Sequence, residues 1–110
     1  RRAALEAAGA EVWVLPDAAA PGRVDLRELM RELAKREVNE VHVEAGPGLS
    51  GALFAAGLID EMLFYYAPCL FGAGMGPAAV PLPAEPGAAY RWRLQSLDQI
   101  GGDFRVLLRR

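Results

Sequence analysis

A glycine-rich corner between positions 46 and 51 constrains this sequence more than any other feature. Glycine occupies positions 46, 48 and 51, and residues without a Cβ let the backbone turn sharply and approach a neighbour closely. Just before the corner, Val41, Val43 and Ala45 alternate with His42 and Glu44, which is the periodicity of a strand. The pattern predicts a strand over residues 40–45 that runs into a tight turn.

A helix of small residues is expected after the corner. Leu49, Ala52, Leu53 and Ala56 fall on one helical stripe, and Gly57 stands where a left-handed residue commonly ends a helix. A chain that enters a helix through glycines makes an anion site, because the free N–H groups and the positive end of the helix dipole point to the same place. The sequence therefore predicts a phosphate-binding helix start.

Glu44 is the unusual residue beside this corner, because it places a charge near the end of an otherwise apolar strand. Open α/β sheets bind ligands outside the carboxyl ends of their strands, so we expect Glu44 to face a ligand. The alternative is a structural carboxylate that pairs with an arginine or a backbone N–H.

The corner also spells G-x-G-x-x-G, the dinucleotide-binding pattern. That fingerprint needs an acidic residue about 20 positions further on, and positions 66–69 hold Tyr, Ala, Pro and Cys instead. The match is weak evidence for a Rossmann fold, and a plain tight turn remains the alternative.

Composition limits the remaining possibilities. A chain of 110 residues makes one domain at most, and a net charge of −2 gives no reason to expect nucleic acid or an anionic membrane as partner. Cys69 is the single cysteine and His42 the single histidine, so neither a disulfide framework nor a metal site is predicted. No apolar run has membrane-spanning length, and the cytoplasm is the expected compartment.

The rest of the chain alternates strands and helices. A continuous apolar run over residues 12–15 predicts a buried strand. Asp25 opens the clearest helix, with Glu28 three residues on as in a capping box. Residues 62–67 form another apolar strand, and four prolines make the stretch from Leu70 to Tyr90 irregular. Residues 91–97 and 104–109 read as a hairpin with a glycine turn at 101–103.

The predicted fold class is therefore α/β, in the order β-α-β-α-β followed by a C-terminal β-hairpin. Consecutive βαβ units imply right-handed crossovers and a parallel sheet with flanking helices. The hairpin adds antiparallel strands, which makes the expected sheet a mixed one.

The stretch from Val43 to Gly72 resembles a known family. It reads V-E-A-G-P-G-L-S-G-A-L-F-A-A-G-L-I-D-E-M-L-F-Y-Y-A-P-C-L-F-G. It is similar to the reductase domain of the bacterial riboflavin-biosynthesis deaminase/reductase, in which a strand ending in E-G-G precedes a leucine-bearing helix, an L-V-D-E segment and an A-P-x-L-x-G strand end. The resemblance implies a dihydrofolate-reductase-like fold, and Ala45 departs from it by replacing the first glycine of the usual pair.

The resemblance also implies a function. The family reaction uses NADPH to reduce a diaminopyrimidinone ribosylamino phosphate to its ribitylamino product, which makes the chain an oxidoreductase of riboflavin biosynthesis. By position, Glu44 is expected to bind the substrate, and no residue is assigned as catalytic. The expected cofactor-binding residues are Gly46, Pro47, Gly48, Leu49, Ser50, Gly51 and Ala52.

The expected domain is incomplete. Residues 1–110 begin within the last turns of a helix and without an initiator Met, so we expect them to be the C-terminal portion of a single NADPH-dependent reductase domain, with weak or no turnover alone. The apolar strand and the aromatic hairpin predict a homodimer. Two alternatives stay open: a dihydrofolate-reductase-like oxidoreductase with another pteridine or pyrimidine substrate, and a non-catalytic assembly module.

Overall fold

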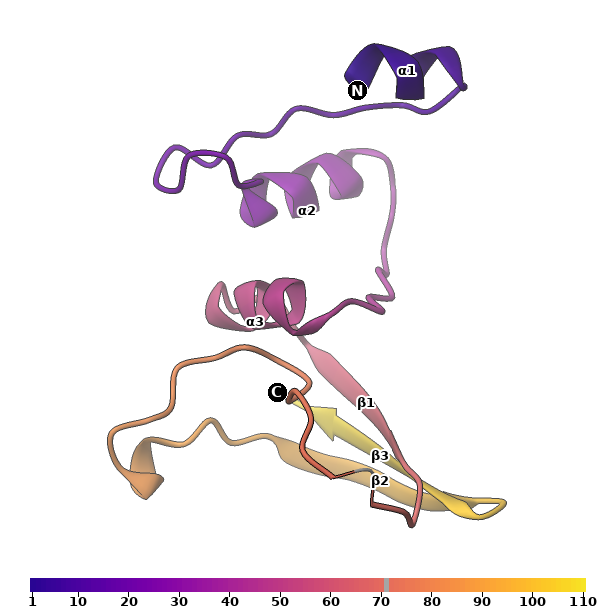
Figure 1. Ribbon diagram of the computed structural model, residues 1–110, viewed down its shortest axis with the longest axis vertical. Helices are drawn as coiled ribbons and strands as arrows, with labels where there is room; N and C mark the ends of the chain where they lie inside the picture. Colours follow the sequence, from indigo (N-terminus) through magenta and orange to yellow (C-terminus); the bar gives the residue numbers. More distant parts are fainter. Residues whose placement is uncertain (71) are drawn as a thin grey trace. The chain divides into compact units, whose positions relative to one another are not determined.

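The computed structural model describes residues 1–70 and 72–110 (Figure 1). Phe71, which the sequence places in the irregular stretch after the third predicted strand, lies outside the described residues. The chain divides into two compact units, Arg1–His42 and Val43–Arg110. The boundary between them falls within the segment that leads into the glycine corner.

The first unit contains two helices, α1 (Arg2–Ala7) and α2 (Leu26–Lys35). Gly9 follows α1 with a φ of 89°, a left-handed conformation that suits glycine at a helix end. α2 begins as the sequence predicts, because the Asp25 carboxylate accepts a hydrogen bond of 2.9 Å from the Glu28 amide. This cap satisfies one of the N–H groups that a helix start leaves without a partner.

Charged pairs cover the outer face of α2. Glu28 binds Arg31 at 2.9 Å, and Glu32 binds both Lys35 and Arg36. The Lys35 ammonium, followed by the Arg36 guanidinium, lowers the pKa of the Glu32 carboxyl. The side chains in these pairs stay at least partly exposed to water, down to 22% for Glu32, so each pair stabilises the helix only weakly.

Two of the predicted strands are wrong. Neither residues 12–15 nor residues 40–45 form a strand in the described parts of the chain, where the nearest pairing is an isolated bridge between Pro16 and Val24. A strand exists only through hydrogen bonds to a neighbouring strand, and an apolar sequence alone does not supply that neighbour. The ring of Trp13 instead lies 3.8 Å below the Arg36 guanidinium, which is a favourable cation–π arrangement.

The second unit carries helix α3 (Pro47–Ala55), a 3-10 turn η1 (Pro86–Ala88) and a three-stranded sheet. The strands are β1 (Glu61–Tyr66), β2 (Arg93–Ile100) and β3 (Asp103–Arg109). Their order is β1-β3-β2 and both pairings are antiparallel. The last three predicted strands are confirmed with small shifts at their ends, and Gly101 makes the predicted turn with a φ of 62°. The described residues form no parallel pairing.

The pairing register gives the sheet two unlike faces. Met62 lies opposite Leu108, Phe64 opposite Val106, and Tyr66 opposite Phe104. Leu94 and Leu97 join this apolar face from β2, and both are about 60% exposed. The other face carries polar groups. There Arg105 binds Asp98 at 2.9 Å and lowers the pKa of that carboxyl, with a smaller contribution from the Ser96 hydroxyl.

The best-packed position of the described residues lies on α3. Leu53 is 5% exposed and is the one large apolar side chain among them that is buried. Gly51, two residues away towards the corner, is buried too. α3 is thus anchored near its middle, with the glycine corner at its N-terminal end.

Candidate functional site

The predicted cofactor-binding residues form the first two turns of α3 and the residue before them. Gly46 is the N-cap, with an extended backbone (φ −68°, ψ 168°), and Pro47 is the first helical residue. Proline suits this position because its φ is already helical and it has no N–H to leave without a partner. α3 therefore begins two residues earlier than the stripe from Leu49 predicts.

Two amides at this helix start lack a partner within the helix. The first hydrogen bond runs from the Ser50 amide to the Gly46 carbonyl at 3.2 Å, so the N–H groups of Gly48 and Leu49 lie ahead of the helical ladder. The Ser50 hydroxyl donates to the Ala45 carbonyl at 3.3 Å. That bond ties the serine side chain to the approaching backbone and helps to hold the corner.

The three corner glycines have different surroundings. A methyl group built on Gly46 or Gly48 would meet no atom within 4 Å. A methyl group on Gly51 would lie 2.3 Å from the carbonyl oxygen of Ala79. The close backbone approach that the sequence predicts is therefore found at Gly51, where the approaching backbone is the chain's own. Open space for a ligand lies at Gly46 and Gly48.

Glu44 is exposed two residues before the N-cap. It belongs to the same compact unit as α3, so the structure keeps the predicted substrate-binding residue next to the predicted cofactor-binding corner. The segment that holds it is irregular, because the expected strand over residues 40–45 does not form.

The corner has no nearby cationic side chain in sequence. No lysine or arginine occurs from position 37 to position 90, whereas carboxylates occur at Glu37, Glu40, Glu44, Asp60, Glu61 and Glu85. Within this stretch of sequence, the groups that can attract an anion to the corner are the backbone N–H groups and the α3 dipole. Among the described residues, no cluster of histidine, cysteine and carboxylate side chains could hold a metal ion.

The sequence predicted where α3 ends but did not mark that end as a site. Gly57 ends the helix as predicted, with a φ of 69°, and the Leu58 amide bonds the Leu53 carbonyl at 3.0 Å. The Arg110 guanidinium donates to the Gly57 carbonyl at 2.9 Å. A cation at a helix C-terminus is favourable, because the dipole is negative there.

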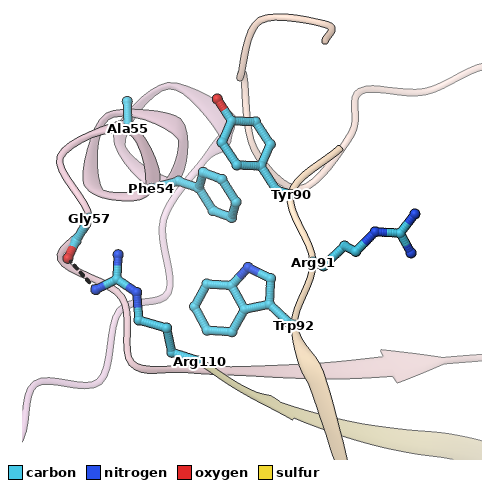
Figure 2. Close-up of a pocket in the computed structure, with 7 residues that line it drawn as sticks. All are labelled: Phe54, Ala55, Gly57, Tyr90, Arg91, Trp92 and Arg110. Carbon is cyan, nitrogen blue, oxygen red and sulfur yellow. Dashed lines mark hydrogen bonds between the residues drawn. The ribbon is translucent and has the colours of Figure 1, made fainter. Parts of the chain in front are cut away.

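A pocket of about 290 Å³ lies at this C-terminal end (Figure 2). The Phe54 ring meets Tyr90 edge-on with centroids 4.6 Å apart, and its centroid is 6.0 Å from that of Trp92. Arg110 closes one side, whereas the guanidinium of Arg91 points away from the rings. None of the predicted site residues lines this aromatic pocket, whose members come from α3, the turn that follows it, the segment before β2 and the residue after β3.

Comparison with known proteins places the chain in a family. The family model described as "RibD C-terminal domain" matches residues 2–106. The chain belongs to the RibD C-terminal domain family. None of the helices described for residues 1–70 and 72–110 has the length and apolar character that crossing a membrane requires.

Relatives and solved structures agree with this assignment. The riboflavin biosynthesis protein RibD of Haemophilus influenzae is 45% identical over 82 residues, which are 74% of this chain and 22% of that protein. A protein of Buchnera aphidicola (subsp. Acyrthosiphon pisum) named 5-amino-6-(5-phosphoribosylamino)uracil reductase is 31% identical over 87 residues, covering 78% of this chain and 42% of its own length.

A solved structure of Acinetobacter baumannii RibD (form 1) matches with a TM-score of 0.71 and 31% identity. The match covers 79% of this chain and 25% of that one. The predicted α/β reductase-domain fold and its partial extent are thus confirmed, even though two of the predicted strands are not. The chain spans about a fifth of the length of the Haemophilus relative.

Proposed function

We propose that this chain is part of an NADPH-dependent reductase of riboflavin biosynthesis. Its substrate would be a diaminopyrimidinone ribosylamino phosphate, reduced to the ribitylamino product. The observation that carries the proposal is the open helix start of α3 in a member of the RibD C-terminal domain family. One relative is named a reductase of a phosphoribosylamino uracil, which supports the same class of substrate.

The residues at the corner fit the diphosphate of a nicotinamide cofactor. The amides of Gly48 and Leu49 lie ahead of the helical ladder, and Gly46 and Gly48 leave room for a close approach. When bound, NADPH supplies the hydride. Nothing between positions 37 and 90 offers a lysine or arginine to the 2′-phosphate, so the choice of NADPH over NADH rests on the family resemblance.

Glu44 would hold the substrate. Its exposed carboxylate can accept hydrogen bonds from the hydroxyl or amino groups of a polar ligand, and it lies two residues before the helix cap. A charged hydrogen bond of this kind fixes the orientation of the substrate relative to the cofactor. The same role would serve another pteridine or pyrimidine, which is the second candidate function.

Substitution of Glu44 tests the proposal. Glu44→Gln in the full-length protein keeps the size of the side chain and removes its charge. Turnover or substrate affinity should fall about ten- to a thousandfold, whereas stability should change by less than about 1 kcal/mol, as exposed substitutions usually do. Glu40 is an exposed glutamate four residues earlier, so Glu40→Gln is the matched control and should leave the kinetics unchanged.

The result separates the enzyme from a non-catalytic module. A large fall in melting temperature with normal kinetics would make Glu44 a structural carboxylate. Comparing the pyrimidine substrate with dihydrofolate as acceptors of NADPH hydride decides between the two candidate functions. The isolated 110 residues should show weak or no turnover.

The apolar sheet face supports a homodimer as the assembly of this protein. Leu94, Leu97, Tyr66 and Phe104 share that face and are all exposed, and burying such a face between two copies would remove it from water. Light scattering of the full-length protein should give at least the mass of a dimer. A monodisperse monomer at high concentration would contradict this. The cytoplasm remains the expected compartment.

A further inference from the structure

The contact between Gly51 and Ala79 is the closest backbone approach at any glycine of the described residues. It joins α3 to the Ala79 loop, which we define as residues 78–80. The carbonyl oxygen, carbonyl carbon and amide nitrogen of Ala79 would lie 2.3, 2.7 and 2.9 Å from a methyl group on Gly51. Any residue other than glycine at position 51 would therefore have to push this backbone away.

A hydrogen bond fixes the same loop to the first residue of α3. The Ala79 amide donates to the Pro47 carbonyl at 2.8 Å. Among the backbone hydrogen bonds found for described residues 72–84, this is the one that reaches another element. The long connection between β1 and β2 is thus attached at the start of α3.

The attachment point lies beside the open amides. The Gly48 nitrogen is bonded to the Pro47 carbonyl carbon, so standard geometry places the Ala79 nitrogen within about 5 Å of the Gly48 nitrogen. A ligand that reaches the Gly48 and Leu49 amides would have the Ala79 loop at its side. The loop is uncharged, so it can shape the site without adding charge to it.

We propose that the Ala79 loop is a side wall of the cofactor site and that Gly51 is a positioning residue that seats this wall. The inference rests on the proposed function. It changes the role expected of Gly51 from the sequence: the glycine admits the chain's own loop, and Gly46 and Gly48 admit the ligand.

Two substitutions disturb the contact from opposite sides. Gly51→Ala adds a methyl group that must displace the Ala79 backbone, while alanine keeps a helix interior well formed. Ala79→Pro removes the amide that bonds Pro47. Proline fits that position, because the Val80 amide bonds the Ala78 carbonyl at 3.1 Å around a residue with negative φ, as in an inverse γ-turn. Gly76→Ala is the matched control, since its methyl group would meet open space.

The first measurement is the dissociation constant of NADPH for the full-length protein, followed by NADPH fluorescence. Gly51→Ala and Ala79→Pro should each raise it about tenfold, because a displaced wall loses preorganised contacts. The double variant should bind NADPH no more weakly than the single variant with the larger loss, because both substitutions break the same contact between Gly51 and Ala79. Gly76→Ala should bind as the wild type does.

The second measurement is hydrogen exchange at the Ala79 amide. It should be protected in the wild type and exchange faster in Gly51→Ala, with circular dichroism showing that the helices persist. Fast exchange in the wild type would overturn the inference. If Gly51→Ala fails to fold, Ala79→Pro carries the test, because it changes the loop alone.

Several outcomes would contradict the proposal that the Ala79 loop is a wall of the cofactor site. Weaker binding in Gly51→Ala with normal binding in Ala79→Pro would mean that Gly51 contacts the cofactor directly. Normal binding in both variants, or effects that multiply in the double variant, would also overturn it. If the wild type does not bind NADPH, the proposed function is wrong and the Ala79 loop cannot be a wall of a cofactor site. A protected Ala79 amide would in that case show only that the loop packs against α3.

Discussion

Helices α2 and α3 differ at their N-terminal amides: α2 has a side-chain cap and α3 has none. α2 closes its own start, because the Asp25 side chain accepts a hydrogen bond from the Glu28 amide. α3 begins at Gly46, which has no side chain to offer, and at Pro47, which has no amide. α2 is also covered with charged pairs, whereas α3 contains no ionisable residue. The cap of α2 satisfies one of the amides at its start, whereas the N-cap residue of α3 offers no side chain to any of them.

The strongest test of this contrast fills the space at the open helix start. Gly48→Val adds a branched side chain where no atom lies within 4 Å, so α3 should still form. NADPH affinity of the full-length protein should fall about a hundredfold, because the bulk occupies the place that a phosphate must approach. Gly74→Val, also open to solvent, is the control for added bulk. If Gly48→Val binds NADPH as tightly as the wild type, the glycine corner is not part of the cofactor site.

A second test gives α3 the kind of cap that α2 has. In Gly46→Asp the carboxylate can reach the Leu49 amide, and the extended backbone of Gly46 suits any residue. The cap should stabilise α3 slightly, by a few tenths of a kcal/mol. NADPH affinity should fall about tenfold or more, because a carboxylate then competes with phosphate for the same donors. Calorimetry gives both quantities, and tighter binding would contradict the prediction.

The converse test removes the cap from α2. Asp25→Ala should cost about 1 kcal/mol of folding free energy, since the Glu28 amide loses its acceptor. Urea unfolding measures this loss, and Asp25→Asn, which keeps an acceptor oxygen, should recover most of it. Cofactor affinity should not change. A loss of affinity in Asp25→Ala would show that the two helix starts are not independent.

The smallest expected effect is a difference in acid sensitivity. Lys35 and then Arg36 lower the pKa of Glu32 below its ordinary 4.5. A carboxyl with a lowered folded-state pKa stabilises the fold above its unfolded-state pKa, and that contribution is lost as the pH falls through the folded-state value. Melting temperatures of wild type and Glu32→Gln should therefore differ at neutral pH and converge as the pH falls below the folded-state pKa of Glu32. Amide exchange within α3 should show no such transition.

The sequence predicted those parts of the fold that short-range chemistry determines. The cap at Asp25, the end of α3 at Gly57 and the turn at Gly101 each depend on one residue type in a fixed local pattern. The alternation of apolar and polar residues in β2 and β3 was also sufficient to predict these two strands. The apolar runs over residues 12–15 and 40–45 were insufficient, because a strand also needs a neighbour, and the run itself does not say where that neighbour is.

The candidate site was predictable in part for the same reason. The glycines and Glu44 could be placed around a helix start because they are close in sequence. The contact of Gly51 with Ala79 joins residues far apart in the chain, and no local pattern marks Ala79. A glycine inside a helix is compatible with a close approach, without indicating whether a ligand or the protein itself approaches.

The strand order has a consequence for synthesis on the ribosome. β3 lies between β1 and β2 although it is the last of the three in the chain, and Glu61 at the start of β1 pairs with Arg109 (Figure 1). At elongation rates of about 5–20 residues per second, β1 has to wait several seconds for this partner. During that time its apolar side chains are accessible to chaperones and to other nascent chains. Premature termination before Asp103 would leave β1 and β2 without the strand that joins them.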